Sequence, residues 1–134
     1  DAHSIPFADS SFDSILAIEV FEHLHDPAKA ASEIYRTLNH NGLAILSMPF
    51  MFHIHGDPSD YQRFTNTGIH TLFKAFRDIT IIPFGSRIHV VSDIVTTGSK
   101  PLAIFRLFNW LLTLPLVCTP SLDCPSGYIV ILSK

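Results

Sequence analysis

One stretch, residues 14–24, limits the possible folds of this chain most strongly. It reads SILAIEVFEHL, an apolar run followed by two acids and a histidine. A short apolar run that comes after a turn is typical of a buried parallel strand. In open α/β sheets, polar side chains at the carboxyl ends of such strands build ligand sites. The stretch therefore predicts an α/β fold with a site near Glu19, Glu22 and His23.

A helix is predicted directly after this stretch. Asp26 is a suitable N-cap, and Pro27 suits the first helical position. Apolar residues recur at helical spacing over Ala30–Leu38. Either Asn41 or Gly42 is expected to end the helix in a left-handed conformation.

Further elements continue the α/β pattern. Residues 43–48 predict a second buried strand, which completes a right-handed βαβ unit. A second helix should begin at Thr65 or Asn66. Residues 78–84 and 128–132 predict two more strands, whereas residues 87–95 fit no single element.

The segment 50–64 is a long loop rich in aromatic, histidine and acidic residues. It follows the carboxyl end of a strand, so we expect it on the same rim as Glu19 and His23. Loops of this length are more often functional than not. Asp60 and Arg63 could shape an acceptor site there, but we favour an ion pair that holds the loop.

The segment 102–117 is almost continuously apolar. It is shorter than the roughly 20 residues that a membrane span needs, and Pro115 interrupts it. We expect a buried helix or helical hairpin, which includes burial in a homodimer interface. A lid over an apolar substrate and a helix that lies on a membrane surface are the alternatives.

Composition narrows the class of protein. The 134 residues suit a single domain, and 47% hydrophobic residues argue against disorder. A net charge of -3 gives no electrostatic footprint for nucleic acid. No signal peptide is visible, so we expect a cytoplasmic protein with peripheral membrane contact as an option. Because the chain starts at Asp1 without a methionine, we expect a fragment of a longer protein.

Four segments resemble class I S-adenosylmethionine-dependent methyltransferases, in particular the type 11 subgroup. Residues 1–13 are similar to the family pattern D-A-x-x-L-P-F-x-D-x-S-F-D, and residues 18–24 to x-E-V-L-E-H-V. Residues 36–42 resemble the turn R-V-L-K-P-G-G, and residues 55–65 resemble a loop found in a subset of the family. The segments occur in the family's order and spacing.

The resemblance implies a partial Rossmann-like sheet. It would hold the family's strands four, five, seven and six, with the last strand antiparallel between its neighbours. The implied reaction is methyl transfer from S-adenosylmethionine. The family's Gly-rich loop lies upstream of the segment at Asp1, so we expect only half of a cofactor site and a truncated domain, residues 1–134.

The resemblance also implies roles for single residues. Asp1 would accept a hydrogen bond from the adenine amino group, and the backbone N–H of Ala2 or His3 would meet the ring. Glu19 would lie beside the methionine end of the cofactor, unless it only binds loop N–H groups. His23 is the candidate general base, because its ordinary pKa is near neutral, and a structural histidine is the alternative.

The pattern Glu19-x-x-Glu22-His23 resembles the metal-binding cluster of small-RNA 2′-O-methyltransferases and some ubiquinone-biosynthesis O-methyltransferases. His53 or His55 would complete such a divalent metal site. The same pattern occurs in relatives where no metal is implied, so no residue is assigned as a metal ligand.

The function expected from the sequence is methyl transfer to a small-molecule, lipid or glycan acceptor, in the full-length protein. The alternative is a degenerate module without catalysis, which binds a partner or forms dimers through residues 102–117.

Overall fold

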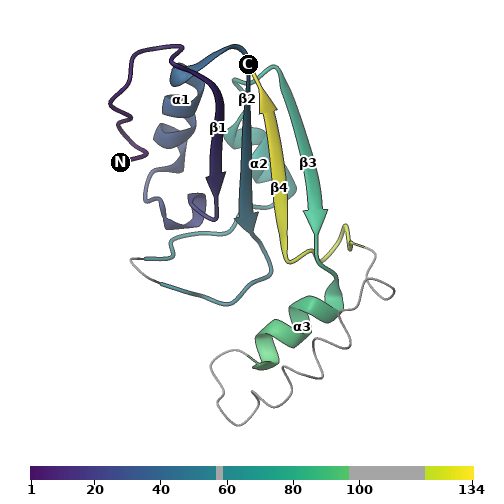
Figure 1. The fold of residues 1–134 in the computed structure, drawn as a ribbon. Coiled ribbons are helices and arrows are strands. Elements are labelled where there is room, and N and C mark those ends of the chain that lie inside the picture. The colour runs from purple at the N-terminus through teal and green to yellow at the C-terminus, as the bar shows by residue number, and fades with distance from the viewer. Residues whose placement is uncertain (57–58, 97–119) are drawn as a thin grey trace.

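The computed structural model describes residues 1–56, 59–96 and 120–134, which form a four-stranded sheet and its connecting helices (Figure 1). In spatial order the strands are β1 (Phe12–Ile18), β2 (Leu38–Pro49), β4 (Gly127–Ser133) and β3 (Asp78–Phe84). β1 is parallel to β2, while β4 is antiparallel to both β2 and β3. This arrangement confirms the predicted mixed sheet, with the last strand antiparallel between its neighbours.

Two helices begin where the sequence predicts, α1 (Pro27–Thr37) and α2 (Asn66–Leu72). The structure adds the 3-10 turn η1 (Phe21–His23) and α3 (Arg87–Thr96), and the sequence assigned residues 87–95 to no single element. The Asp26 side chain accepts a hydrogen bond from the backbone N–H of Lys29, and Thr65 accepts one from Gly68. Each cap satisfies a backbone donor that the first helical turn leaves unpaired.

The turn between α1 and the centre of β2 differs from the prediction. Asn41 is left-handed, with φ of 64°, as expected for one of the two candidate residues. However, α1 ends four residues earlier, and Asn41 lies in an irregular part of β2 where the register with β1 shifts. A Cβ on Gly42 would lie 2.7 Å from the Leu38 side chain, so glycine permits a close approach there.

The two faces of the sheet differ in burial. The face toward α1 and α2 holds the core, including Ala44, Leu46, Met48, Tyr128, Val130 and Leu132 (Figure 1). Side chains alternate along strands, so the neighbours of these residues point the other way. That second face, called the exposed face here, carries the exposed apolar residues Leu16, Ile18, Ile82 and Ile129. β1 is therefore apolar on both of its faces.

The predicted apolar helix at 102–117 lies outside the described residues. Within residues 1–56, 59–96 and 120–134, no helix is long and apolar enough to cross a membrane.

Two leucines test the difference between the faces. Leu46 is fully buried on the core face, and Leu16 is 70% exposed on the opposite one. We expect Leu46→Ala to lower the free energy of unfolding by about 2–5 kcal/mol, because it leaves a cavity. Leu16→Ala should change it by less than about 0.5 kcal/mol. Urea unfolding of both variants measures this, and equal losses would contradict the assignment of the exposed face.

Candidate functional site

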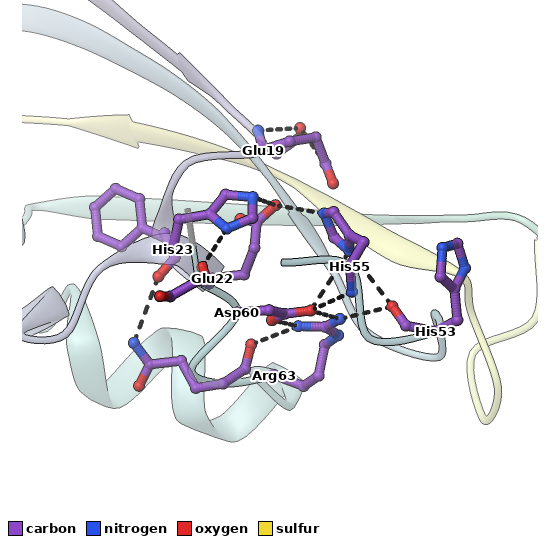
Figure 2. A network of polar contacts seen from close by, with 11 residues as sticks. Glu19, Glu22, His23, His53, His55, Asp60 and Arg63 are labelled. Carbon is purple, nitrogen blue, oxygen red and sulfur yellow. Dashed lines mark hydrogen bonds and ion pairs between the residues drawn. The ribbon is translucent and has the colours of Figure 1, made fainter. Parts of the chain in front are cut away.

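Glu19 follows the carboxyl end of β1 and is held there by β2. Its backbone is left-handed, with φ of 51°. Its N–H donates to the Ser47 carbonyl and hydroxyl, and its Oε1 accepts from the Ser47 hydroxyl at 2.5 Å. The side chain is exposed and lies apart from the other labelled acids and histidines (Figure 2). Ser47 therefore fixes a carboxylate at the sheet edge where the resemblance places the methionine end of the cofactor.

The loop after β2, called the rim loop here (residues 50–64), is bound to η1. The Tyr61 N–H donates to the Glu22 carbonyl at 2.8 Å, and the Gln62 amide donates to the Leu24 carbonyl at 2.7 Å. The His23 ring places Nδ1 2.6 Å from the Ser59 carbonyl. Because a carbonyl only accepts, this Nδ1 carries the proton and His23 Nε2 has a free lone pair.

An ion pair holds the rim loop in shape. The Asp60 carboxylate binds the Arg63 guanidinium through both oxygens, and Arg63 also donates to the His53 carbonyl at 3.0 Å (Figure 2). The Asp60 carboxylate accepts from the His55 N–H at 3.0 Å. These bonds from Arg63 hold the pKa of Asp60 well below its usual range. The predicted pair that holds the loop is thus confirmed.

Glu22, in η1, is a buried acid beside the rim loop. Its side chain is fully buried, and neither carboxylate oxygen has a hydrogen-bond partner in the described part of the chain. Its Oε1 lies 3.6 Å from His23 Nε2 and 3.8 Å from His55 Nε2 (Figure 2). Burial raises the pKa of Glu22. These three residues form the Glu22 cluster, whose potential ligand atoms lie within 4.8 Å of one another.

The structure brings together only part of the set that the sequence suggested for a metal. Glu22, His23 and His55 meet, whereas Glu19 is turned away to Ser47. His53 is also outside, because its Nδ1 lies 2.9 Å from an oxygen of Asp93 on α3. His53 and His55 both lie in a loop without regular secondary structure, so the sequence alone could not select between them.

The residues expected near the adenine lie beside the start of α1. Asp1 Oδ1 accepts from the backbone N–H of His3 at 2.9 Å and lies 2.7 Å from its Nδ1. His3 Nε2 accepts from the backbone N–H of Asp26 at 3.3 Å, so the buried His3 ring links the Asp1 carboxylate to the backbone at the start of α1. Ala2 packs against the core. The cofactor contacts of Asp1, Ala2 and His3 stay predictions.

A clamp on α1 holds this N-terminal loop, and the sequence analysis did not identify it. Glu33 accepts from the Ile5 N–H at 2.8 Å and pairs with Arg36 at 2.8 Å. Arg36 in turn donates to the carbonyls of Ile5 and Phe7 and to the Asp9 carboxylate. The bonds from Arg36 lower the pKa of Glu33 to about 2. Two residues at i, i+3 thus fix a loop that has no regular secondary structure.

Comparisons with known proteins agree with the resemblance. Residues 1–46 match the family described as a methyltransferase domain. No match is found among curated proteins.

Solved structures show the same fold. A Thermotoga maritima protein described as an S-adenosylmethionine-dependent methyltransferase, a possible histamine N-methyltransferase, is 16% identical with a TM-score of 0.63, over 99% of this chain and 61% of that one. A methyltransferase from Archaeoglobus fulgidus is 18% identical with a TM-score of 0.59, over 100% and 65%. A Haemonchus contortus phosphoethanolamine N-methyltransferase, solved with phosphomonomethylethanolamine and S-adenosylhomocysteine, is 18% identical with a TM-score of 0.59, over 99% and 35%.

At these identities the comparison establishes the fold. This chain spans between 35% and 65% of the length of these three proteins.

The clamp on α1 predicts a pH-dependent stability. The pKa of Glu33 is about 2 in the fold, against 4.5 without its partners. Its ionised form therefore stabilises the fold above pH 4.5, and this contribution is lost as the pH falls from 4.5 towards 2. Glu33→Gln should be less stable than the wild type at pH 7, and the difference should shrink towards pH 3.

Urea unfolding at several pH values measures the difference. Asp123→Asn, at an exposed acid in the loop before β4, is the control and should show little difference from wild type at any pH. A Glu33→Gln deficit that is the same at pH 7 and pH 3 would contradict the role of its charge.

Proposed function

Because its first 46 residues and its fold identify this chain as a class I S-adenosylmethionine-dependent methyltransferase of the type 11 family, we propose that it takes part in transferring a methyl group from this cofactor to an acceptor. The observation that carries the proposal is the placement of Glu19. Its exposed carboxylate is fixed by Ser47 at the carboxyl end of β1. In open α/β sheets this edge binds the ligand.

This chain would supply one half of the cofactor site. Asp1 and the backbone of Ala2 and His3 would face the adenine, and Glu19 would accept hydrogen bonds at the methionine end. When bound, S-adenosylmethionine supplies an already activated methyl group. The work of the protein residues is then mainly positioning and exclusion of water.

The acceptor would bind on the rim loop. A cavity of about 350 Å³ lies there, lined by Phe50, Met51, Phe52, His53, Ile54 and Ile94. Its mainly apolar lining supports an acceptor with an apolar part, which a small molecule, a lipid or a lipid-linked glycan would provide. His23 is the candidate base, since its Nε2 is the ring nitrogen that is free to accept a proton.

The exposed face of the sheet supports a second candidate function, that of a binding or assembly module without catalysis. Apolar side chains are exposed on this face at both ends of the strand order, at Leu16 and Ile18 of β1 and at the paired residues Ile82 of β3 and Ile129 of β4. Contiguous exposed apolar patches mark interaction sites in soluble proteins. A homodimer that also uses residues 102–117 would fall into this class.

Calorimetry with S-adenosylmethionine tests the methyltransferase proposal. A longer polypeptide that contains this chain should bind the cofactor, and Glu19→Gln should weaken binding about tenfold, because a charge-assisted hydrogen bond is lost. Asp78→Asn, an acid at the opposite edge of the sheet, is the control and should bind like wild type. Unchanged binding by Glu19→Gln would place Glu19 outside the site. Micromolar binding by the 134-residue chain alone would contradict the half-site.

Sedimentation velocity tests the second candidate. We expect the 134-residue chain to self-associate through the exposed face, and Leu16→Lys to shift it towards monomer, because a charge would be buried on association. Leu122 is 81% exposed in the loop before β4, so Leu122→Lys is the matched control. If both substitutions have the same effect, the exposed face is not the interface.

A further inference from the structure

The Glu22 cluster contains a carboxylate that receives no hydrogen bond from the described residues. The Glu22 carboxylate is fully buried, and both of its oxygens lack hydrogen-bond donors among the described residues. Burying an ionised carboxylate is strongly unfavourable unless a cation or hydrogen bonds compensate. Buried groups of this kind therefore require a bound water, a proton or an ion as an explanation.

The two imidazoles beside Glu22 are oriented as metal ligands are. His23 Nδ1 donates to the Ser59 carbonyl at 2.6 Å, which leaves Nε2 free towards Glu22. His55 Nδ1 lies 3.4 Å from the His53 carbonyl oxygen and 3.4 Å from an Asp60 oxygen, so its Nε2 is also free. Metal-binding histidines almost always donate their other N–H to a carbonyl or carboxylate in this way.

The spacing also favours an ion between the three side chains. The separations of 3.6 and 3.8 Å between Glu22 Oε1 and the two Nε2 atoms are too long for hydrogen bonds. Two ligand atoms that are each about 2.1 Å from one tetrahedral metal lie about 3.4 Å apart. Small movements of partly exposed histidines would reach that geometry.

The surrounding charges are compatible with a dication. Glu19 and Glu22 are both acidic, and Glu19 lies close enough to influence Glu22 electrostatically. Arg63 is a cation near the cluster, and Asp60 binds it through both oxygens and offsets its charge. The cluster therefore has an excess of negative charge.

We propose that Glu22 Oε1, His23 Nε2 and His55 Nε2 bind one first-row divalent transition metal. Two imidazoles and one carboxylate suit zinc, iron, cobalt or nickel, whereas magnesium and calcium prefer oxygen ligands. Three protein ligands leave coordination positions open. The His23 and His55 side chains are 21% and 33% exposed, so the site can be reached from solvent. This site goes beyond the proposed methyl transfer and does not depend on it.

Titration with Co²⁺, followed by its visible absorption, tests the site on the 134-residue chain. Wild type should bind one equivalent, and Glu22→Gln and His55→Gln should each weaken binding on the order of 100-fold or more. His53→Gln is the matched control, because His53 lies on the same loop but binds Asp93. It should bind Co²⁺ like wild type. Circular dichroism of each variant verifies that it is folded.

Three results would overturn the proposal. The first is no Co²⁺ binding by wild type, which would mean that a water or a proton satisfies Glu22. The second is binding by a folded His55→Gln that equals wild type, which would assign the ion to other histidines. The third is an equal loss in His53→Gln and His55→Gln. None of these results bears on S-adenosylmethionine binding, which calorimetry measures separately.

Discussion

The rim of this protein depends on one constraint, the burial of the Glu22 carboxylate. Glu22 lies in η1 with its side chain buried, and hydrogen bonds from Tyr61 and Gln62 to the carbonyls of Glu22 and Leu24 hold the rim loop beside it. A buried polar network that is only partly hydrogen-bonded lowers the stability of the fold, so the positions of the groups around such a carboxylate are constrained. Asp60 binds Arg63 through both carboxylate oxygens, and the rings of His23 and His55 face Glu22 (Figure 2).

A second arrangement of charges positions the other end of the site. The loop before β1 has no helix or strand to hold it, yet Glu33 and Arg36 bind its backbone at Ile5 and Phe7. His3 then connects Asp1 to the start of α1. Residues expected to meet the adenine are therefore fixed by α1, whose own start is capped by Asp26. Helix and loop depend on each other.

Local chemistry explains what could be predicted. The N-caps at Asp26 and Thr65 follow from short-range hydrogen bonds, and the sequence contains both partners. The sequence could not predict that Glu19 and Glu22 point to different places. This difference depends on a left-handed backbone at Glu19 and on Ser47 from β2. The exposure of Leu16 likewise depends on which face α1 and α2 cover, and an apolar strand does not specify that.

The division of this pair gives the two acids different roles. Glu19 remains exposed and, in the proposed function, would accept hydrogen bonds from a cofactor, while the buried Glu22 would bind a cation. His23 has two proposed roles, general base and metal ligand. Its single free ring nitrogen cannot accept a proton while it binds a metal. If Nε2 binds the metal, the acceptor must lose its proton differently. A metal held by Glu22, His23 and His55 would supply such a route, because a bound dication lowers the pKa of a coordinated hydroxyl. A metal at Glu22 would therefore replace the general base rather than assist it.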